Sequence, residues 1–175
     1  DGTGDYLSLL DSDDWYLSTG DGTIAFWARF TSLTDATFVA QHYGANNTFY
    51  FDYIVSTHKI RFYYRYSAST VADYDYTWTP TIDTWHYIEL VRSGSNLYLF
   101  IDGDKKTWTT ITTPISTNDL GNLPALLTIG YNADPTIGTY FAGYMDEFCW
   151  SKGIARHTAN FNVPTQAYLT GGVDT

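Results

Sequence analysis

The sequence predicts an all-β fold, namely a two-sheet antiparallel β-sandwich of the jelly-roll kind. Aromatic residues make up 18% of the 175 residues, and sixteen of them are tyrosines. Threonine, valine and isoleucine recur while only two glutamates occur, and this mixture suits half-buried pleated strands better than helices. Turn residues return at short intervals, and no helical stripe persists for three turns between them.

Eleven segments between these turns have the length and residue types of strands. The first follows Asp1-Gly2, the next two lie between Asp21-Gly22 and the turn at 44–47, and the others are separated in the same way. In chain order they span 6–10, 22–30, 37–43, 48–56, 59–67, 72–78, 85–93, 97–103, 106–111, 125–131 and 141–151. Hairpins are expected at 93–96 and at Asp102-Gly103, because an Asp-Gly pair supplies the positive φ of a tight turn. One helical turn is expected at 152–158.

Length and charge limit the possible partners. A chain of this length fits one sandwich domain, assigned to residues 1–170, with 171–175 as a tail or linker. The formal charge of −10 repels phosphate backbones, so nucleic acid is not an expected partner. No run of about 18 apolar residues is present, so no membrane insertion is expected. The single cysteine, Cys149, excludes an internal disulfide.

Two consecutive strands carry the clearest alternation of inward and outward side chains. The residues expected to face the core are Phe49, Phe51, Tyr53 and Val55 in the first strand, and Ile60, Phe62, Tyr64 and Tyr66 in the second. Those expected outside are Tyr50, Asp52, Arg61, Tyr63 and Arg65. If the strands pair, this outward set could bind sugars, since tyrosines stack on pyranose rings and arginines grip acidic sugars in bidentate fashion. Ordinary cross-strand pairing, or burial against another domain or subunit, explains the same pattern.

Loop tips are the rival ligand site, because sandwiches often carry binding residues on their loops. The two most suitable loops are 43–48, with Asn46 and Asn47, and 131–140, with Asn132 and Asp134. Sequence alone does not choose between the outward strand face and these loops.

The carboxylates do not form an obvious catalytic pair. A retaining glycosidase needs two carboxyl groups about 5 Å apart on one face, but Glu89 and Glu147 are distant in sequence. Asp146 does not supply the missing partner, since neighbours on a regular strand face opposite ways. Asp73 and Asp75 share a face and are the best remaining candidates, although acids that keep an edge strand soluble would look the same. We therefore expect a protein without catalytic residues.

The last predicted strand requires a bulge. Met145, Phe148 and Trp150 all face the core only if one extra residue is inserted at Asp146-Glu147. Such a bulge is expected to turn Asp146 sideways towards the first strand and to leave Cys149 facing away from the core.

Five stretches resemble, in order, the laminin-G-like jelly rolls of the concanavalin A-like lectin and glucanase superfamily. They are "DGTGDYLSL", "GTIAFWARF", "WHYIELVRSGSNLYLFIDG", "LTIGY" and "FAGYMDEFCWSKGIARHTANF". The resemblance implies two packed antiparallel sheets, one with a concave outer face. Family members hydrolyse β-glucans, bind sugars or bind proteins. The closing "SKGIARHTANFNVPT" is most similar to the version in bacteriophage virion and tail-fibre proteins.

The resemblance also implies a structural calcium ion between the last and first strands. The matching positions are Asp146 as a carboxylate ligand, with Asp1 and the Gly2 carbonyl as further oxygens. The alternative is that Asp146 hydrogen-bonds backbone amides at the strand irregularity.

Together these observations favour a non-catalytic carbohydrate-binding or adhesion module on a virion or another extracellular surface. Its expected partner is a glycan or host-surface polysaccharide, with other virion or surface protein chains as further partners. A structural or protein-interaction domain without a glycan ligand is the main alternative, and a glycoside hydrolase or lyase comes third.

Overall fold

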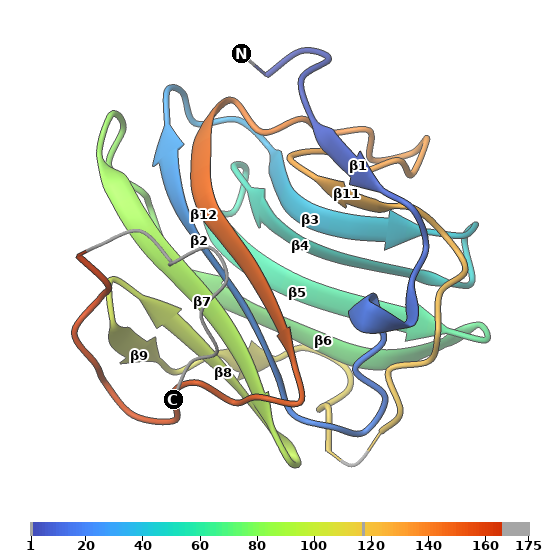
Figure 1. The fold of residues 1–175 in the computed structure, drawn as a ribbon. Helices are drawn as coiled ribbons and strands as arrows, with labels where there is room; N and C mark the ends of the chain where they lie inside the picture. The colour runs from blue at the N-terminus through green and yellow to red at the C-terminus, as the bar shows by residue number, and fades with distance from the viewer. Residues whose placement is uncertain (1, 117, 166–175) are drawn as a thin grey trace.

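Two antiparallel sheets pack face to face in the computed structural model, which describes residues 2–116 and 118–165. The strands are β1 (Leu7–Leu9), β2 (Gly22–Phe30), β3 (Ala36–His42), β4 (Thr48–Ile54), β5 (Lys59–Tyr66), β6 (Ser69–Thr77), β7 (Trp85–Ser93), β8 (Asn96–Ile101), β9 (Asp104–Lys106), β10 (Thr109–Thr110), β11 (Leu127–Ile129) and β12 (Gly143–Lys152). The seven-stranded sheet has the order β1-β11-β3-β4-β5-β6-β10, and the five-stranded sheet has the order β12-β2-β7-β8-β9 (Figure 1). The all-β sandwich prediction is confirmed.

The strands follow the predicted segments closely, and two local predictions need correction. Segment 106–111 is divided between β9 and β10, which lie in different sheets. The helical turn expected at 152–158 is absent, and the described helical turn is instead a 3-10 helix at Asp13–Trp15. The Ser12 hydroxyl accepts a bond from the Asp14 amide and caps this turn. No helix in the described part of the chain is long and apolar enough to cross a membrane.

The hairpins at 93–96 and at Asp102-Gly103 are confirmed. Strands β7 and β8 pair from Ser93 opposite Asn96, and β8 pairs with β9 across the second turn. The φ angles of Asp102 and Gly103 are 56° and 81°, the two positive values that a tight hairpin turn of this kind requires.

Aromatic rings from both sheets fill the space between them. Phe26 of β2 lies 5.1 Å from Phe38 of β3 and 6.0 Å from Phe51 of β4, measured between ring centroids. All three side chains are fully buried. The inward alternation predicted for β4 and β5 is therefore confirmed, since their alternate residues pack against this core.

The bulge in β12 is also confirmed. Asp146 lies opposite Trp27 and Cys149 lies opposite Ala25, so β12 has one more residue than β2 between these pairs. Glu147 takes up the irregularity with a φ of 52°. Beyond the bulge, Phe148 joins the other predicted inward residues against the core.

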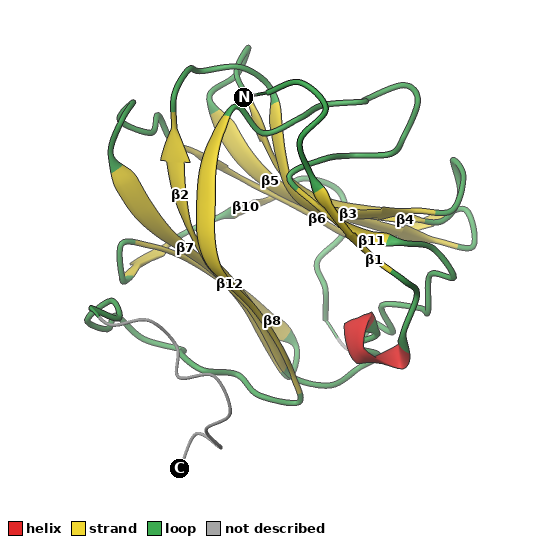
Figure 2. Cartoon of the chain, turned by 45° about the horizontal axis from the view of Figure 1, so that its top comes forward, coloured by secondary structure: helices red, strands yellow, loops and turns green. Residues whose placement is uncertain are grey.

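Residues 154–165, here called the strap, follow β12 and cover part of the five-stranded sheet. Figure 2 shows the strap on the side of this sheet that faces away from the seven-stranded sheet. The Phe161 ring lies 5.3 Å from Phe100 and 5.9 Å from Tyr87, while the Phe161 amide donates to the Gly103 carbonyl. The predicted tail, 171–175, lies outside the described residues.

Candidate functional site

The outward side chains of β4 and β5 meet across the predicted hairpin. Asp52 lies opposite Arg61, and Tyr50 lies opposite Tyr63. The two tyrosine rings stack with centroids 5.0 Å apart and an interplanar angle of 17°. The sequence-based pairing and the shared face of these four residues are confirmed.

These side chains satisfy one another rather than pointing freely into solvent. Arg61 donates from Nε and Nη2 to the two Asp52 oxygens at 3.1 and 2.7 Å, and its guanidinium lies 4.6 Å from the Tyr50 ring centroid. Asp52 is only 4% exposed. Burial raises the pKa of the Asp52 carboxyl, and the bonds from Arg61 oppose that rise. The bidentate grip that we predicted for an acidic sugar is therefore already used within the sheet.

Strand β6 adds two more carboxylates to this face, and the shared face predicted for Asp73 and Asp75 is confirmed. Asp75 pairs with Lys59, and Asp73 accepts a bond from the Thr112 hydroxyl at 3.0 Å. Burial raises the pKa of Asp73 above its ordinary value. Both acids have partners suited to a structural role. The outward residues of β4, β5 and β6 include three cations and three carboxylates. They are Lys59, Arg61 and Arg65 against Asp52, Asp73 and Asp75.

The 131–140 loop brings the rival loop site onto this face. Its residue Thr139 bonds the Thr37 hydroxyl of β3 at 2.7 Å, and Asp134 lies 3.5 Å from His42 Nδ1. Between the loop and the sheet is a hollow of about 240 Å³, here called the face hollow. Its lining residues are Asp35, Asp52, Tyr53, Ile54, Arg61, Thr136, Ile137 and Thr139.

The predicted loop residues have different roles in the structure. Asn132 is fully buried and accepts a bond from the Asp134 amide, so it shapes the loop instead of facing a ligand as predicted. Burial alone would raise the pKa of Asp134, but two bonds from Thr136 lower it below its ordinary value. In the other loop, Asn47 accepts from the Ser67 amide, while Asn46 is exposed. Asn46 and Asn47 do not line the face hollow.

Of the predicted calcium ligands the structure describes Asp146 and Gly2, and it does not bring these two together. The first strand, β1, joins the seven-stranded sheet, and Asp146 faces the outside of the other sheet beside Trp27, which corrects the expected orientation. Gly2 lies against Ala142, roughly 13 Å of strand from Asp146. Asp146 accepts the Glu147 amide at 2.8 Å, as the alternative required. No group of three acidic, histidine or cysteine side chains suited to a metal is found among the described residues. Asp1 lies outside them, so the calcium ion that the family resemblance implies is neither confirmed nor contradicted.

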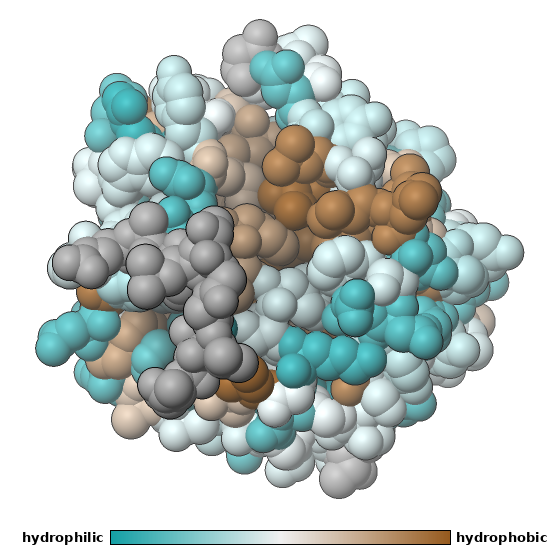
Figure 3. All heavy atoms as spheres, in the orientation of Figure 1, coloured by the Kyte–Doolittle hydropathy of each residue, from teal (hydrophilic) through white to brown (hydrophobic). Residues whose placement is uncertain are grey.

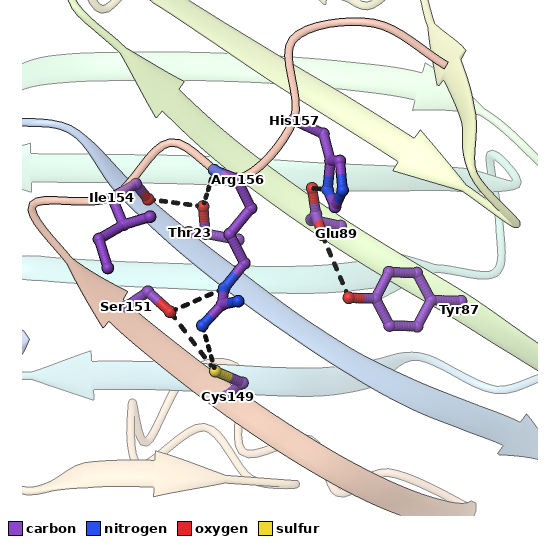
Figure 4. Close-up of polar contacts among 8 residues, drawn as sticks. All are labelled: Thr23, Tyr87, Glu89, Cys149, Ser151, Ile154, Arg156 and His157. Atoms are coloured by element: carbon purple, nitrogen blue, oxygen red, sulfur yellow. Dashed lines mark hydrogen bonds and ion pairs between the residues drawn. The ribbon is translucent and has the colours of Figure 1, made fainter. Parts of the chain in front are cut away.

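Glu89, one of the two glutamates, is fully buried beneath the strap (Figure 4). His157 Nδ1 and the Tyr87 hydroxyl contact its two oxygens at 2.8 and 3.1 Å. Beside this contact, Arg156 donates to the Ser151 hydroxyl at 3.1 Å and approaches Cys149 Sγ at 3.8 Å. Cys149 thus faces away from the core, as predicted. These groups fasten the strap to the sheet, and no sequence pattern indicated that Glu89 and His157 would meet.

The family model described as the concanavalin A-like lectin/glucanases superfamily, of the laminin G type, matches residues 1–154. The chain belongs to this superfamily. No curated protein sequence matches this laminin G-like domain.

Solved structures share its fold at low sequence identity. Domains LG4-5 of the mouse laminin α1 chain have a TM-score of 0.61 at 16% identity, over 94% of this domain and 43% of that chain. Domain 4 of the arabinanase AbnA from Geobacillus stearothermophilus, in complex with arabinotriose, has a TM-score of 0.59 at 16% identity, over 86% and 68%. The sialidase CBM40 from Ruminococcus gnavus, bound to α2,3 sialyllactose, has a TM-score of 0.56 at 13% identity, over 79% and 78%.

These similarities establish the fold, and the description of the superfamily includes both lectins and glucanases. The laminin G-like domain spans less than half of the laminin chain. Fold alone therefore does not assign its ligand.

Proposed function

We propose that the domain is a non-catalytic carbohydrate-binding module whose ligand occupies the face hollow. The hollow joins polar side chains of β4 and β5 to the 134–139 loop, and it is the observation that carries the proposal. Arg61 retains an Nη1 donor group outside its two bonds to Asp52. The Thr136 and Thr139 hydroxyls bond Asp134 and Thr37, and their oxygens keep lone pairs that can accept from a ligand. Such a lining suits the hydroxyl groups of a sugar.

The proposed ligand is an uncharged saccharide. The hollow is lined by two carboxylates, Asp35 and Asp52, and by one cation, Arg61, which already holds Asp52 in a bidentate pair. An acidic sugar would be repelled by these two carboxylates, and a bidentate grip on it would displace the buried Asp52 from Arg61 at a substantial cost in free energy. A neutral sugar adds hydrogen bonds and leaves the pair intact.

A glycan array followed by titration calorimetry tests this proposal. We expect neutral oligosaccharides to bind the full chain, and Thr136→Val to weaken binding by about tenfold, because the substitution removes a hydroxyl oxygen of the hollow and the bond by which this hydroxyl holds Asp134 in the loop. Tyr98→Ala, on the outer side of β8, is the matched control and should bind as the unchanged protein does. An array without any bound glycan would contradict the proposal, as would equal affinities for Thr136→Val and the unchanged protein.

The absence of catalysis is part of the same proposal. Asp73 and Asp75, the best catalytic candidates, are bonded to Thr112 and Lys59, and Glu89 is buried under the strap. Incubation with laminarin, agar, hyaluronan and peptidoglycan should release no products. Turnover that disappears in Asp73→Asn or Asp75→Asn would show an enzyme.

We further propose display on a phage virion or another extracellular surface. The support is the similarity of the closing stretch "SKGIARHTANFNVPT" to virion and tail-fibre domains, together with the laminin similarity. Binding of the purified protein to host cells, and its loss after enzymatic removal of surface polysaccharide, would test this setting.

A protein-interaction domain is the second candidate, favoured by one observation. Leu7 and Leu10 at edge strand β1 are 66% and 81% exposed. Figure 3 shows an apolar region between β1 and β12, where a hollow of about 390 Å³ includes Leu7, Ile129 and Met145. Exposed apolar areas of this kind mark contact surfaces. A blank glycan array combined with concentration-dependent self-association in sedimentation velocity would favour this candidate.

A further inference from the structure

A groove on the outer side of the five-stranded sheet carries chemistry that the proposed glycan site does not use. It has a volume of about 530 Å³ and is here called the outer groove. Its lining residues are Trp27, Trp85, Asp146, Glu147, Val163, Pro164 and Thr165. The face hollow belongs to the other sheet, so the two sites share no residue.

The strand register places the indoles and the acids together. Asp146 of β12 lies directly opposite Trp27 of β2, so their Cβ atoms are about 5 Å apart. Trp85 of β7 lies opposite Arg29, two residues along β2 from Trp27, which makes the two tryptophans diagonal neighbours. Diagonal neighbours are about 7 to 8 Å apart, and aromatic side chains can contact one ligand across this distance.

The bulge allows two consecutive carboxylates to line one groove. On a regular strand Glu147 would point away from Asp146 and into the core. The extra residue and the positive φ of Glu147 instead leave both side chains on the groove. A non-glycine residue in this conformation costs about 1 kcal/mol or more in free energy. The backbone conformation that places these two acids in the groove is therefore less favourable in free energy than that of a regular strand.

The charges around the groove favour a positively charged ligand. Asp146 and Glu147 are the acids that line it, in a chain of formal charge −10. The neighbouring cation, Arg29, is already bonded to Asp83 at 2.9 Å and lies 5.5 Å from the Tyr144 ring centroid. Trp85 remains 41% exposed. Indole faces attract cations, and carboxylates beside them add to that attraction. An anion would be repelled, whereas a neutral sugar would gain stacking and hydrogen bonds to the carboxylates but no attraction between opposite charges.

We propose that the outer groove binds an organic cation, either a guanidinium group or an alkylated ammonium group. The indoles of Trp27 and Trp85 contact the apolar part of the cation, and Asp146 and Glu147 balance its charge. The strap residues Val163 and Pro164 form the apolar wall. This inference is independent of the proposed glycan binding, because it rests on the other sheet.

Tryptophan fluorescence and calorimetry of the full chain test the inference with three probes. Tetramethylammonium chloride represents alkylated ammonium, an arginine-containing peptide amide represents guanidinium, and 3,3-dimethylbutanol is a neutral compound of similar shape. We expect at least one cation to bind about fivefold or more tightly than the neutral compound. The tighter of the two cations identifies the source of the charged group.

Variants then locate the binding. Trp85→Ala and Asp146→Asn should each weaken cation binding about fivefold or more, and Asp146→Asn keeps an oxygen that can accept the Glu147 amide. Thr136→Val, which alters the face hollow, is the control and should leave cation affinity unchanged. Three results would overturn the proposal. The neutral compound could bind as tightly as the cations, or neither cation could bind at concentrations up to about 50 mM, which is on the order of the weakest useful affinity. Both variants could also bind the cations as tightly as the unchanged protein does. The proposal would also be overturned if a sugar bound the unchanged protein and Thr136→Val but did not bind Trp85→Ala.

Discussion

The outward side chains of the two sheets are satisfied in different ways. On the seven-stranded sheet, polar side chains of neighbouring strands satisfy one another, as Asp52 and Arg61 do, and the 131–140 loop covers only part of the face. On the five-stranded sheet, the strap covers Glu89 and Phe100, both fully buried, and leaves the outer groove open beside it. Strand alternation predicts which side chains point outward, but it does not predict which of them a distant segment covers.

The difference shows where stability and binding are expected to separate. The outer face of the seven-stranded sheet contains a buried ion pair, and breaking this pair should mainly lower the free energy of unfolding. The outer face of the five-stranded sheet contains aromatic packing and a buried carboxyl group. Changes to the aromatic packing should loosen the strap, and changes to the carboxyl group should alter the pH dependence of stability. Four changes test this contrast, from the largest expected effect to the smallest.

Arg61→Ala should lower the free energy of unfolding by about 3–5 kcal/mol, because it leaves the buried Asp52 carboxylate without its partner. Urea denaturation at pH 7 measures this. Arg29→Ala breaks the more exposed pair with Asp83 on the other sheet and should cost less than about 1 kcal/mol. Equal costs for the two variants would show that the outer face of the seven-stranded sheet is not held by its ion pair.

Phe161→Ala should cost about 2 kcal/mol, because Phe161 is half-buried and its ring stacks on His157 with centroids 3.6 Å apart. Limited proteolysis should then cleave within 154–165 sooner than in the unchanged protein. Tyr144→Ala, an exposed change on the same sheet outside the strap, is the control and should have little effect on either measurement. Unchanged proteolysis of Phe161→Ala would mean that this ring does not hold the strap.

Glu89→Gln should alter the pH dependence of stability. Burial raises the pKa of Glu89 above its ordinary value of 4.5, although His157, Tyr87 and Arg156 oppose the rise. The folded protein therefore holds this proton to a higher pH than the unfolded chain, and raising the pH through this range costs folding free energy. Relative to the unchanged protein, Glu89→Gln should gain stability as pH rises from 4.5 and reach a plateau above the folded pKa. Denaturation curves at half-unit steps of pH that differ by a constant amount would contradict this.

Calcium should have the smallest effect. The described ligands do not assemble around Asp146, and its carboxylate already accepts the Glu147 amide. We expect melting temperatures in EDTA and in millimolar calcium to agree within about 1 °C, well below the shift of several degrees that 1 kcal/mol produces. A calcium-dependent rise that Asp146→Ala abolishes would instead show the calcium site that the family resemblance implied.

Much of the fold follows from the sequence, and so do two residues of the proposed glycan site, Asp52 and Arg61. The strand positions, the two hairpins and the β12 bulge were predicted, because alternation and turn chemistry act between near neighbours in the chain. The sequence also predicts that Asp52 and Arg61 are neighbours, since one short turn joins their strands. The burial of Asn132 was not, because it depends on how the 131–140 loop folds back on itself and over β3.

The segment "GYMDEFCWSKG" shows which features follow from the sequence and which depend on the tertiary structure. Its alternation alone determined that Met145, Phe148 and Trp150 close the core and that an extra residue lies at Asp146-Glu147. Only the tertiary structure placed Asp146 beside Trp27 and Trp85, and only it covered Glu89 with His157. Periodicity constrains the face on which a side chain lies, whereas its neighbours on that face come from strands and segments that are distant in the chain.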